Sequence, residues 1–371
     1  NIADSTITAT LAIVPYIMKD GNIQRITSYT VNFEKKNNKT PTYSHQKNAT
    51  TYPSNSVLSS GRWYKIAINS TGIYRIPADD MAEKGINISG LAISQLGIYG
   101  NGGGALSENN NNFEYNDLTE NAIYVKDNNN NGIFDGNDYL LFYAQAADIW
   151  KHNKTLNRYE YHVHPYAKTN YYYLGINVFG TKRIEVTNIP QSATQTISTY
   201  TYCSTIHNDL INTHKSGRIW VGEKFSNAVS SRSFSLAIPH AVVGSTINVR
   251  YALASVSSAN SSFSVTIGGK SQNHSYTPGY KYPYQGYSAS TTATAESKCD
   301  IDIHYSFRES MATGYLDFIE INATAALSLG SGQLHFRNKE NIGTNKVSQF
   351  EISNTPSSTR IWNVSDPSNV Y

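Results

Sequence analysis

Charged side chains are scarce in this 371-residue chain. Asp, Glu, Lys and Arg together make up 15% of it, against about 25% in an average soluble protein. The net charge of +3 is not gathered into a basic run, so nothing favours a nucleic acid or an anionic membrane as a partner. No apolar stretch approaches the roughly 18 residues of a membrane span. We therefore predict no nucleic-acid binding and no membrane-spanning segment.

Cysteine is nearly absent. The two residues, Cys203 and Cys299, fit an extracellular or periplasmic protein, in which thiols are few or paired. A bridge between them would stabilise the fold by about 4–5 kcal/mol in the chain-entropy model. The sequence does not distinguish this disulfide from two buried free thiols, and both alternatives stay open. The first ten residues, NIADSTITAT, lack the basic and apolar regions of a signal peptide, so we expect any signal peptide to have been removed.

Helical periodicity is rare too. One helix is expected over residues 77–85, PADDMAEKG, because Pro begins it, two acids follow in its first turn and Gly85 ends it. Elsewhere short runs of period two alternate with turn residues, which is typical of β-sandwiches. Examples are the early strands joined at DGN (20–22), WYKIAI (63–68), GIYRIP (72–77), TINVRYALASV (246–256) and QLHFRN (333–338).

These patterns predict an all-β fold of two β-sandwich (jelly-roll-like) domains, with one short helix and a calcium-loop insertion. The composition changes near residues 186–200, TNIPQSATQTIST. We therefore place one domain at residues 1–190 and a second at residues 195–371.

Oxygen-bearing side chains are concentrated in DNNNNGIFDGND, residues 127–138. Counted from its first residue, this stretch matches a twelve-position calcium loop, D-x-[DN]-x-[DN]-G with an acid at position 12. A Ca²⁺ ion binds six to eight hard oxygens, and a tight turn at the glycine points alternate side chains inward. The predicted ligands are Asp127, Asn129, Asn131, the carbonyl of Ile133, Asp135 and Asp138.

The flanks of this loop differ from those of an EF-hand. AIYVK (122–126) and YLLFYA (139–144) are strand-like, so we predict a strand–calcium loop–strand unit with a structural role. An Asp at position 12 in place of a bidentate Glu predicts a weak, extracellular type of site, with a dissociation constant of roughly 10⁻⁴–10⁻³ M. The alternative is an Asn-rich turn that binds nothing.

Three other motifs have both a functional and a structural interpretation. GNGGG (100–104) lacks the Lys-Ser/Thr of a phosphate-binding loop, so a glycine turn is favoured. His162 and His164 alternate on a strand and would face the same side, but no third metal ligand is nearby in sequence. A Tyr-rich run is either a sugar or peptide platform or a self-packed loop; its members are Tyr276, Tyr280, Tyr282, Tyr284 and Tyr287.

Catalysis has little support in the sequence. Cys203 lies four residues before His207, outside the glycine-rich strand end that exposes a nucleophile. Cys299 lies five residues before His304 on a strand, so the two side chains face opposite sides. No GxSxG motif is present. We expect this chain not to be an enzyme.

Several phrases in order resemble one family. They are SGRWYKIAINSTGIYRI (60–76), IYGNGGG (98–104), DNNNNGIFDGNDYLLFYA (127–144), SGRIWVGEKF (216–225), GYLDFIEINA (314–323) and IWNVSDPSNV (361–370). Over nearly its whole length the chain is similar to the region upstream of the peptidase domain in PorU-like cell-surface sortases. These are gingipain-type cysteine peptidases of the Bacteroidetes type IX secretion system.

The resemblance implies a non-catalytic part of a larger protein. In that family the catalytic domain, with its His and Cys dyad, begins just after the IWNVSDP-like phrase, so no catalytic residue carries over to this sequence. The resemblance implies a location on the outer face of the outer membrane. It also implies three kinds of partner, which are the protein's own C-terminal peptidase domain, other secretion components and cargo.

Three hypotheses follow. The first is the N-terminal scaffold or docking region of such a sortase. The second is a stand-alone extracellular glycan- or peptide-binding protein that uses the Tyr-rich run. A third and weaker one is a metallo-hydrolase that uses His162 and His164.

Overall fold

The computed structural model describes residues 2–3, 6–7, 16–25, 53–109, 112, 115–178, 182–186, 192–213, 220–278, 284–339 and 347–371. For residues 2–3, 6–7, 16–19, 23–25 and 284–288 only the backbone is described. The chain divides into two compact units, residues 1–52 and residues 53–371. Within the described residues, no helix combines the length and the apolar character that crossing a membrane requires.

The first unit contains short antiparallel pairs. One pair consists of β1 (Ile2–Ala3) and β2 (Thr6–Ile7), and the other of β3 (Tyr16–Lys19) and β4 (Asn22–Arg25). Asp20 and Gly21 join β3 to β4 with φ of 52° and 78°. Positive φ at both central residues is the backbone of a type I′ hairpin turn. The hairpin predicted at DGN is therefore confirmed.

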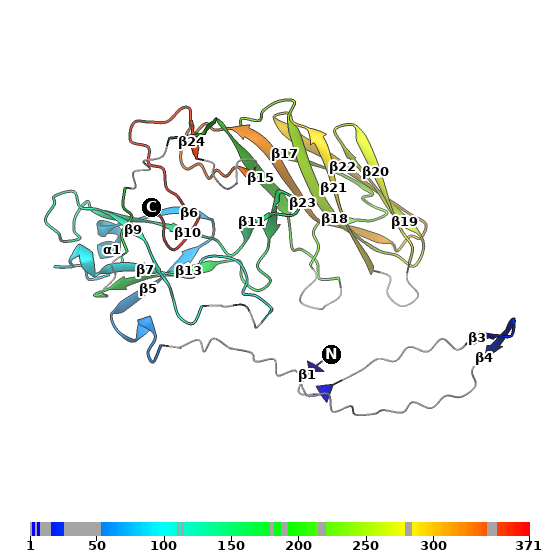
Figure 1. Ribbon diagram of the computed structural model, residues 1–371, viewed down its shortest axis with the longest axis horizontal. Coiled ribbons are helices and arrows are strands. Elements are labelled where there is room, and N and C mark those ends of the chain that lie inside the picture. The colour runs from blue at the N-terminus through cyan, green and yellow to red at the C-terminus, as the bar shows by residue number, and fades with distance from the viewer. Residues whose placement is uncertain are drawn as a thin grey trace. The chain divides into compact units, whose positions relative to one another are not determined.

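The second unit begins with a sandwich of two sheets (Figure 1). One sheet has the order β5–β13–β7–β8, with bounds Arg62–Ile68, Asn170–Ile176, Leu96–Tyr99 and Glu120–Asn121. The other has the order β6–β10–β9, with bounds Gly72–Pro77, Tyr139–Ala144 and Ile123–Lys126. Both sheets contribute to one core, whose largest fully buried side chains include Tyr172, Phe134 and Phe142.

The predicted helix is present as α1 (Ala78–Glu83). Pro77 precedes it, Asp79 and Asp80 lie in its first turn, and Gly85 follows it with φ of 74°. The helix buries Ala78 and Met81 against the first core. Two short 3-10 helices complete this part, η1 (Val57–Ser59) and η2 (Ile93–Gln95).

A second sandwich follows. Its first sheet has the order β15–β23–β18–β21, with bounds Thr199–His207, Thr313–Ala326, Thr246–Val256 and Tyr284–Thr294, and β16 (Lys224–Phe225) also pairs with β23. Its second sheet has the order β17–β22–β19–β20, with bounds Ser231–Ala237, Lys298–Phe307, Ser261–Ile267 and Lys270–Tyr276.

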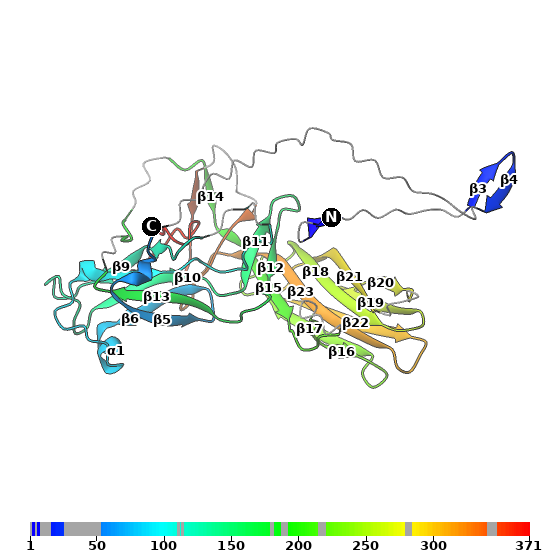
Figure 2. The same ribbon diagram turned by 90° about the horizontal axis from the view of Figure 1, so that it is seen from below.

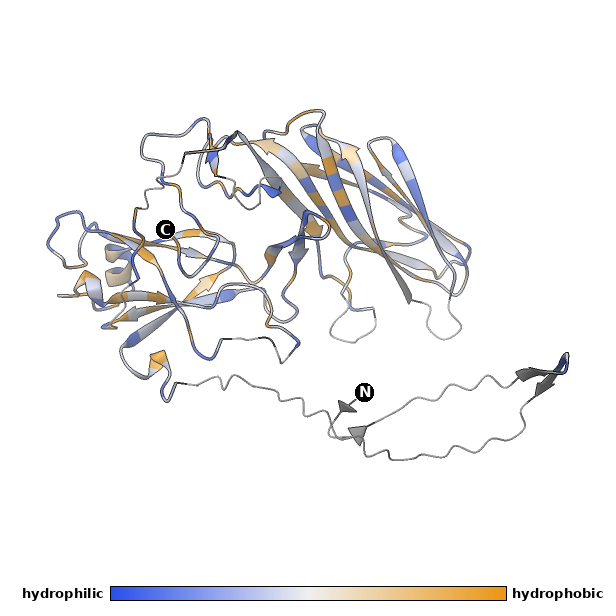
Figure 3. Cartoon of the chain, in the orientation of Figure 1, coloured by the Kyte–Doolittle hydropathy of each residue, from blue (hydrophilic) through white to orange (hydrophobic). Residues whose placement is uncertain are grey.

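Alternation of buried and accessible residues is clearest in the second sheet of this sandwich. In β22 every second residue from Cys299 to Tyr305 is buried, and the residues between them are exposed. Figure 3 shows the same alternation of hydrophobic and hydrophilic residues along these strands. Because successive side chains on a strand point to opposite faces, one face of each sheet forms the core and the other faces outward.

Two further elements connect these sheets. The antiparallel hairpin of β11 (Ile149–Asn153) and β12 (Arg158–His162) lies against β15 and β23 (Figure 2). The strands β14 (Gln195–Ile197) and β24 (Ser348–Phe350) pair in parallel.

The all-β prediction is confirmed, with β-sandwich domains and one α-helix among the described residues. The boundary near residue 190 falls between the two hydrophobic cores, and as a domain boundary it stays a prediction. One predicted strand is wrong, because residues 333–338 form no strand. Instead the Gln333 side chain accepts a hydrogen bond from the Ile73 backbone N–H and donates one to the Ile73 carbonyl, both at 2.8 Å.

Candidate functional site

The loop of residues 127–138 joins two paired strands. β9 ends at Lys126 and β10 begins at Tyr139, and these two residues lie opposite each other in the antiparallel ladder. Gly132 has φ of 76°, a left-handed conformation that glycine adopts without a steric penalty. The strand–loop–strand unit and the turn at Gly132 are therefore confirmed.

Backbone N–H groups orient the first three candidate ligands. Gly132 N–H donates to Asp127 Oδ2 at 2.9 Å, and Asn131 N–H donates to Asn129 Oδ1 at 3.2 Å. Ile133 N–H donates to Asn131 Oδ1 at 2.7 Å. A carboxylate or amide oxygen that accepts one such bond keeps a second lone pair. The loop thus holds three side-chain oxygens in place and leaves each able to bind a cation.

The other Asp127 oxygen, Oδ1, is buried and has no hydrogen-bond partner within the described structure. An unpaired buried carboxylate oxygen is costly. A cation at this point would compensate that cost, so the orphaned oxygen is the observation that best fits a metal.

The last two acids close the loop. Asp135 accepts amide N–H groups from Asn129 and Asn131, both at 3.1 Å, so three candidate ligands converge. Asp138 is 1% exposed and accepts the backbone N–H groups of Asn128 at 2.8 Å and of Asp135 at 3.2 Å. An antiparallel bridge between Ala92 and Ile133 fixes the loop beside η2. Its hydrogen bonds run from Ile93 N–H to the Gly132 carbonyl at 3.0 Å and from Phe134 N–H to the Leu91 carbonyl at 2.8 Å.

This donor set is of the kind that a hard divalent cation prefers. Carboxylate, amide and carbonyl oxygens are the usual ligands of Ca²⁺. Histidine, cysteine, aspartate and glutamate alone form no metal-holding group of three in the described part of the chain. The site therefore depends on Asn129 and Asn131 as well as on its acids, and the six predicted ligands remain a prediction.

The two cysteines are free thiols, and they belong to different sheets of the second sandwich. Cys299 lies in the second core between the two sheets. Cys203 lies opposite Asn322, on the outer face of β15, because its neighbour Tyr202 faces the core. Of the two alternatives left open by the sequence, the structure thus has the free thiols, because Cys203 faces away from the core and Cys299 faces into it.

Of the two alternatives for the Tyr-rich run, its first member follows the self-packed one. Tyr276 is 5% exposed and packs edge-on against Phe263 in the core, so its assignment to a ligand platform is wrong. Tyr280 and Tyr282 lie outside the described residues. Tyr284 and Tyr287 lie in β21, where only the backbone is described.

The remaining motifs have structural surroundings. His164 Nδ1 accepts hydrogen bonds from the backbone N–H groups of Tyr166 and Ala167, so this histidine closes a turn. His162 is exposed to solvent, and partial desolvation of its ring by neighbouring atoms, together with nearby Lys151, lowers its pKa. GNGGG starts the loop from β7 to β8, where a side chain at Gly103 would collide with the Ala146 carbonyl.

The hairpin of β11 and β12 is fastened to the outer face of the second sandwich by a buried amide. Asn322 on β23 is 4% exposed. Its Oδ1 accepts the Tyr159 N–H at 2.6 Å, and its Nδ2 donates to the Tyr159 carbonyl at 2.9 Å. The Asn322 amide thus makes the same pair of hydrogen bonds to Tyr159 that the backbone of a neighbouring β-strand would make.

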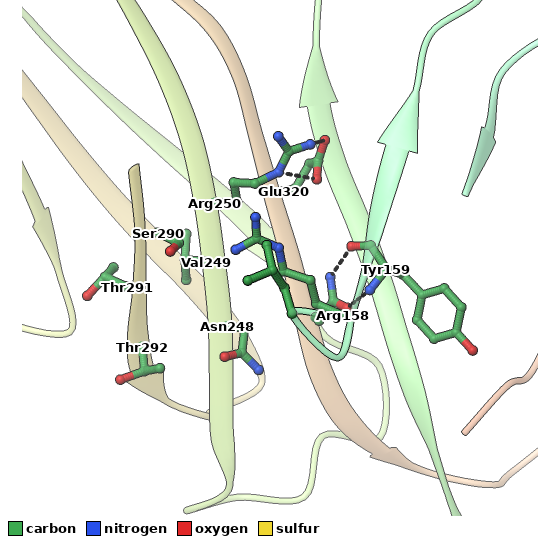
Figure 4. Close-up of a pocket in the computed structure, with 11 residues that line it drawn as sticks. Arg158, Tyr159, Asn248, Val249, Arg250, Ser290, Thr291, Thr292 and Glu320 are labelled. Carbon is green, nitrogen blue, oxygen red and sulfur yellow. Dashed lines mark hydrogen bonds and ion pairs between the residues drawn. The ribbon is translucent and has the colours of Figure 1, made fainter. Parts of the chain in front are cut away.

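Beside this contact lies a polar cleft of about 280 Å³. Arg158 lines it from the hairpin, and Arg250 lines it from β18 (Figure 4). Its other polar lining comes from β18, β21 and β23, and includes Asn248, Ser290, Thr292 and Glu320.

Each arginine of the cleft is paired with a glutamate. Arg250 donates from Nε and Nη2 to the two oxygens of Glu320, at 3.0 and 2.6 Å. Burial raises the pKa of Glu320, and Arg250 opposes that rise. Arg158 donates from Nε and Nη2 to Glu160 Oε1, at 2.8 and 2.7 Å. Burial favours a higher pKa for Glu160, but these bonds outweigh it and the pKa is lowered.

Sequence reasoning missed this cleft. The sequence contains one signal that could have indicated it, because Arg250 in TINVRYALASV and Glu320 in YLDFIEINA are charged residues inside predicted strands. Charged residues inside strands occupy the face that is not in the core. The hairpin that covers this face is far away in sequence, however, so no local pattern indicates the contact.

No family model matches the chain, and no curated protein does. Among solved structures, it is similar to dimeric latent PorU from Porphyromonas gingivalis, with 22% identity and a TM-score of 0.66. The match covers 81% of this chain and 28% of the PorU chain, so this chain corresponds to under a third of PorU.

Smaller partial likenesses were also found. One is to a carbohydrate-binding module, CBM36, in complex with calcium and xylotriose, with 18% identity over 32% of this chain and 87% of the module, at a TM-score of 0.21. Another is to the CBM36-1 domain of a multidomain xylanase from the hindgut metagenome of Trinervitermes trinervoides. It has 11% identity over 37% of this chain and 98% of that domain, at a TM-score of 0.22. The chain therefore shares its fold with part of PorU.

Proposed function

We propose that this chain is the non-catalytic N-terminal scaffold and docking region of a PorU-like cell-surface sortase that processes type IX secretion cargo. The observation that carries the proposal is the fold shared with PorU over 81% of the chain. The six sequence phrases that resemble this family support it independently, because they are spread from residue 60 to residue 370.

The state of the two thiols supports a non-catalytic role. The thiolate is the nucleophilic form of cysteine, and a reactive cysteine has a lowered pKa. Burial instead raises the pKa of Cys203 to about 12 and that of Cys299 to about 11. Both lie within strands. Peptide cleavage in the parent protein would then require a separate domain.

Scaffolding is what the described contacts support. The Asn322 clamp, by which we mean its two hydrogen bonds to Tyr159, joins segments that are distant in sequence. The two hydrogen bonds between the Gln333 side chain and the Ile73 backbone do the same. Such a body would hold the protein's own C-terminal peptidase domain at the outer face of the outer membrane. It would also offer surfaces to other secretion components and to cargo.

We further propose that residues 127–138 bind a structural Ca²⁺ ion. Asp127, Asn129, Asn131, Ile133, Asp135 and Asp138 would hold it. When bound, the ion would offset two of the three carboxylate charges and cross-link the two ends of the loop between β9 and β10. A calcium titration of the purified chain tests this part of the proposal.

The reading frame tests the main proposal. We expect the coding sequence to continue past the codon for Tyr371 into a gingipain-type peptidase domain. A stop codon at that position would overturn the proposal and leave the stand-alone glycan- or peptide-binding protein as the better hypothesis. A second test incubates the purified chain with a peptide panel. Cleavage that disappears in Cys203→Ala or Cys299→Ala would show that this chain is itself a peptidase.

A further inference from the structure

The dipeptide Asn131–Gly132 lies at the turn of the candidate calcium loop, and both of its residues are exposed. An asparagine that precedes a glycine can react with its own backbone, because the glycine nitrogen attacks the carbonyl carbon of the asparagine side chain. Glycine has no side chain to hinder this approach. The loop surrounds the dipeptide with hydrogen bonds that favour the reaction.

These bonds hold and activate both reacting groups. Asn131 Oδ1 accepts the Ile133 N–H at 2.7 Å, a bond to the residue two positions on that folds the side chain over the Gly132 peptide. The same bond polarises the side-chain carbonyl, as a donor in an oxyanion hole does. The Gly132 N–H donates to Asp127 Oδ2 at 2.9 Å, and a carboxylate acceptor makes this nitrogen a better nucleophile.

The leaving group has a partner too. Asn131 Nδ2 donates to Asp135 Oδ2 at 3.1 Å, so the nitrogen that would depart as ammonia is held by a second carboxylate. The space at Gly132 is open, because a Cβ built on it would meet no atom within 4 Å. Nothing in the described structure therefore blocks closure of a five-membered ring at this turn.

The chain contains one other Asn–Gly dipeptide, Asn101–Gly102, and its surroundings differ. The Asn101 side chain is bound to a different segment, since Oδ1 accepts the Thr119 N–H at 2.9 Å and Nδ2 donates to the Asp117 carbonyl at 3.1 Å. Gly102 is closely packed, because a Cβ built on it would lie 2.9 Å from Gln145 Oε1. Folding should therefore protect Asn101, which serves as an internal control.

We propose that Asn131 is a self-modification site, which converts to aspartate or isoaspartate in the folded protein. The Gly132 nitrogen forms a bond to Asn131 Cγ, the Cγ–Nδ2 bond breaks, and the proton of the Gly132 N–H leaves with the departing nitrogen as ammonia. One water molecule then opens the succinimide ring at either of its carbonyl groups.

The two products would change the calcium loop in different ways. Aspartate adds a fourth carboxylate, whereas isoaspartate adds a methylene group to the backbone and so shifts the alternate spacing of the ligands. This consequence rests on the proposed calcium site, but the conversion itself does not.

Peptide mapping by mass spectrometry tests the inference on the purified full chain, incubated in EGTA at 37 °C. Conversion raises the mass of the peptide by about 1 Da, and the isoaspartate form elutes separately from the aspartate form. In the folded protein Asn131 should convert at least about tenfold faster than Asn101. In urea the two dipeptides should convert at similar rates, because both are then unfolded.

The variant Asp127→Asn separates activation by the loop from mere exposure. It keeps an acceptor for the Gly132 N–H but removes the carboxylate charge, so Asn131 should convert at least about fivefold more slowly. Glu83→Gln, which removes the same charge at an exposed position of α1, should leave the rate unchanged. An unchanged rate in Asp127→Asn would overturn the inference.

Two results for the natural protein would also overturn it. One is equal conversion of Asn131 and Asn101 in the folded state, and the other is conversion of both in urea but of neither in the folded state. The calcium site is tested separately, because these incubations contain EGTA. A protein that converts at Asn131 but shows no calcium shift in Tm would remove the proposed calcium ion and keep this inference.

Discussion

Removal of calcium should destabilise the protein by a small and calculable amount. A ligand that binds only the folded state stabilises it by RT ln(1 + [L]/Kd). For a dissociation constant of roughly 10⁻⁴–10⁻³ M, 2 mM calcium adds about 0.7–1.8 kcal/mol to the free energy of unfolding. In a compact unit of about 300 residues this shifts Tm by about 1–3 °C.

The substitution that isolates the site is Asp127→Asn. The asparagine oxygen can still accept the Gly132 N–H, so the loop keeps the bond seen at 2.9 Å. Its amide nitrogen would replace Oδ1, the buried oxygen that has no partner among the described residues. We therefore expect Asp127→Asn to be at least as stable as the natural protein in chelator, and less stable than it in calcium.

Differential scanning calorimetry with excess EGTA or with 2 mM CaCl₂ measures both effects. Glu83→Gln, at an exposed position of α1, removes the same charge and should keep the full calcium shift. The reasoning fails if the natural protein shows no shift, or if Asp127→Asn shows the same shift.

Other predictions concern the second sandwich and its contacts. Replacing Asn322 by Leu should lower the free energy of unfolding by about 2–4 kcal/mol in urea titrations, because it leaves the Tyr159 N–H and carbonyl without partners; an effect below 0.5 kcal/mol would mean that the clamp contributes little. Burial and nearby positive charge lower the pKa of His335 below its usual 6.5. The unfolded state then binds more protons between the lowered pKa and 6.5, so stability should be complete above pH 6.5 and fall as the pH drops through this range. His335→Phe should reduce that slope in denaturation curves taken from pH 5 to 8, and an unchanged slope would contradict the assignment. Because burial raises both thiol pKa values, Cys203 and Cys299 should react with a disulfide reagent at pH 8 at least a hundredfold faster in urea than in the folded protein. A thiol that reacts equally fast in urea and in the folded protein would be accessible and would contradict this prediction.

The local structure was readable from the sequence because it depends on neighbouring residues. Period-two alternation identified GIYRIP as β6 and TINVRYALASV as β18, with the bounds that the structure has. Pro77 and Gly85 set the limits of α1, and Gly132 marked the turn of the loop. The family resemblance predicted the fold shared with PorU, which structural comparison finds at an identity of 22%.

Strand pairing was decided by the tertiary structure. The strands β5 and β6 are adjacent in sequence, yet they pair with β13 and β10 in different sheets. Alternation shows that a segment is a strand and which residues share a face, but not which partner completes its ladder. That partner is selected by burial of the whole apolar face, a property of segments far apart in the chain.

The sequence by itself thus determined the β-rich class, the helix, the strand–loop–strand unit and the alternation of each strand. Only the tertiary structure decided that Cys299 faces the core while Cys203 faces away from it, that Tyr276 is core, and that Asn322 binds Tyr159. The physical reason is the range of the interactions. Backbone conformation and side-chain alternation follow from adjacent residues, whereas burial and pairing follow from which distant surfaces exclude water together.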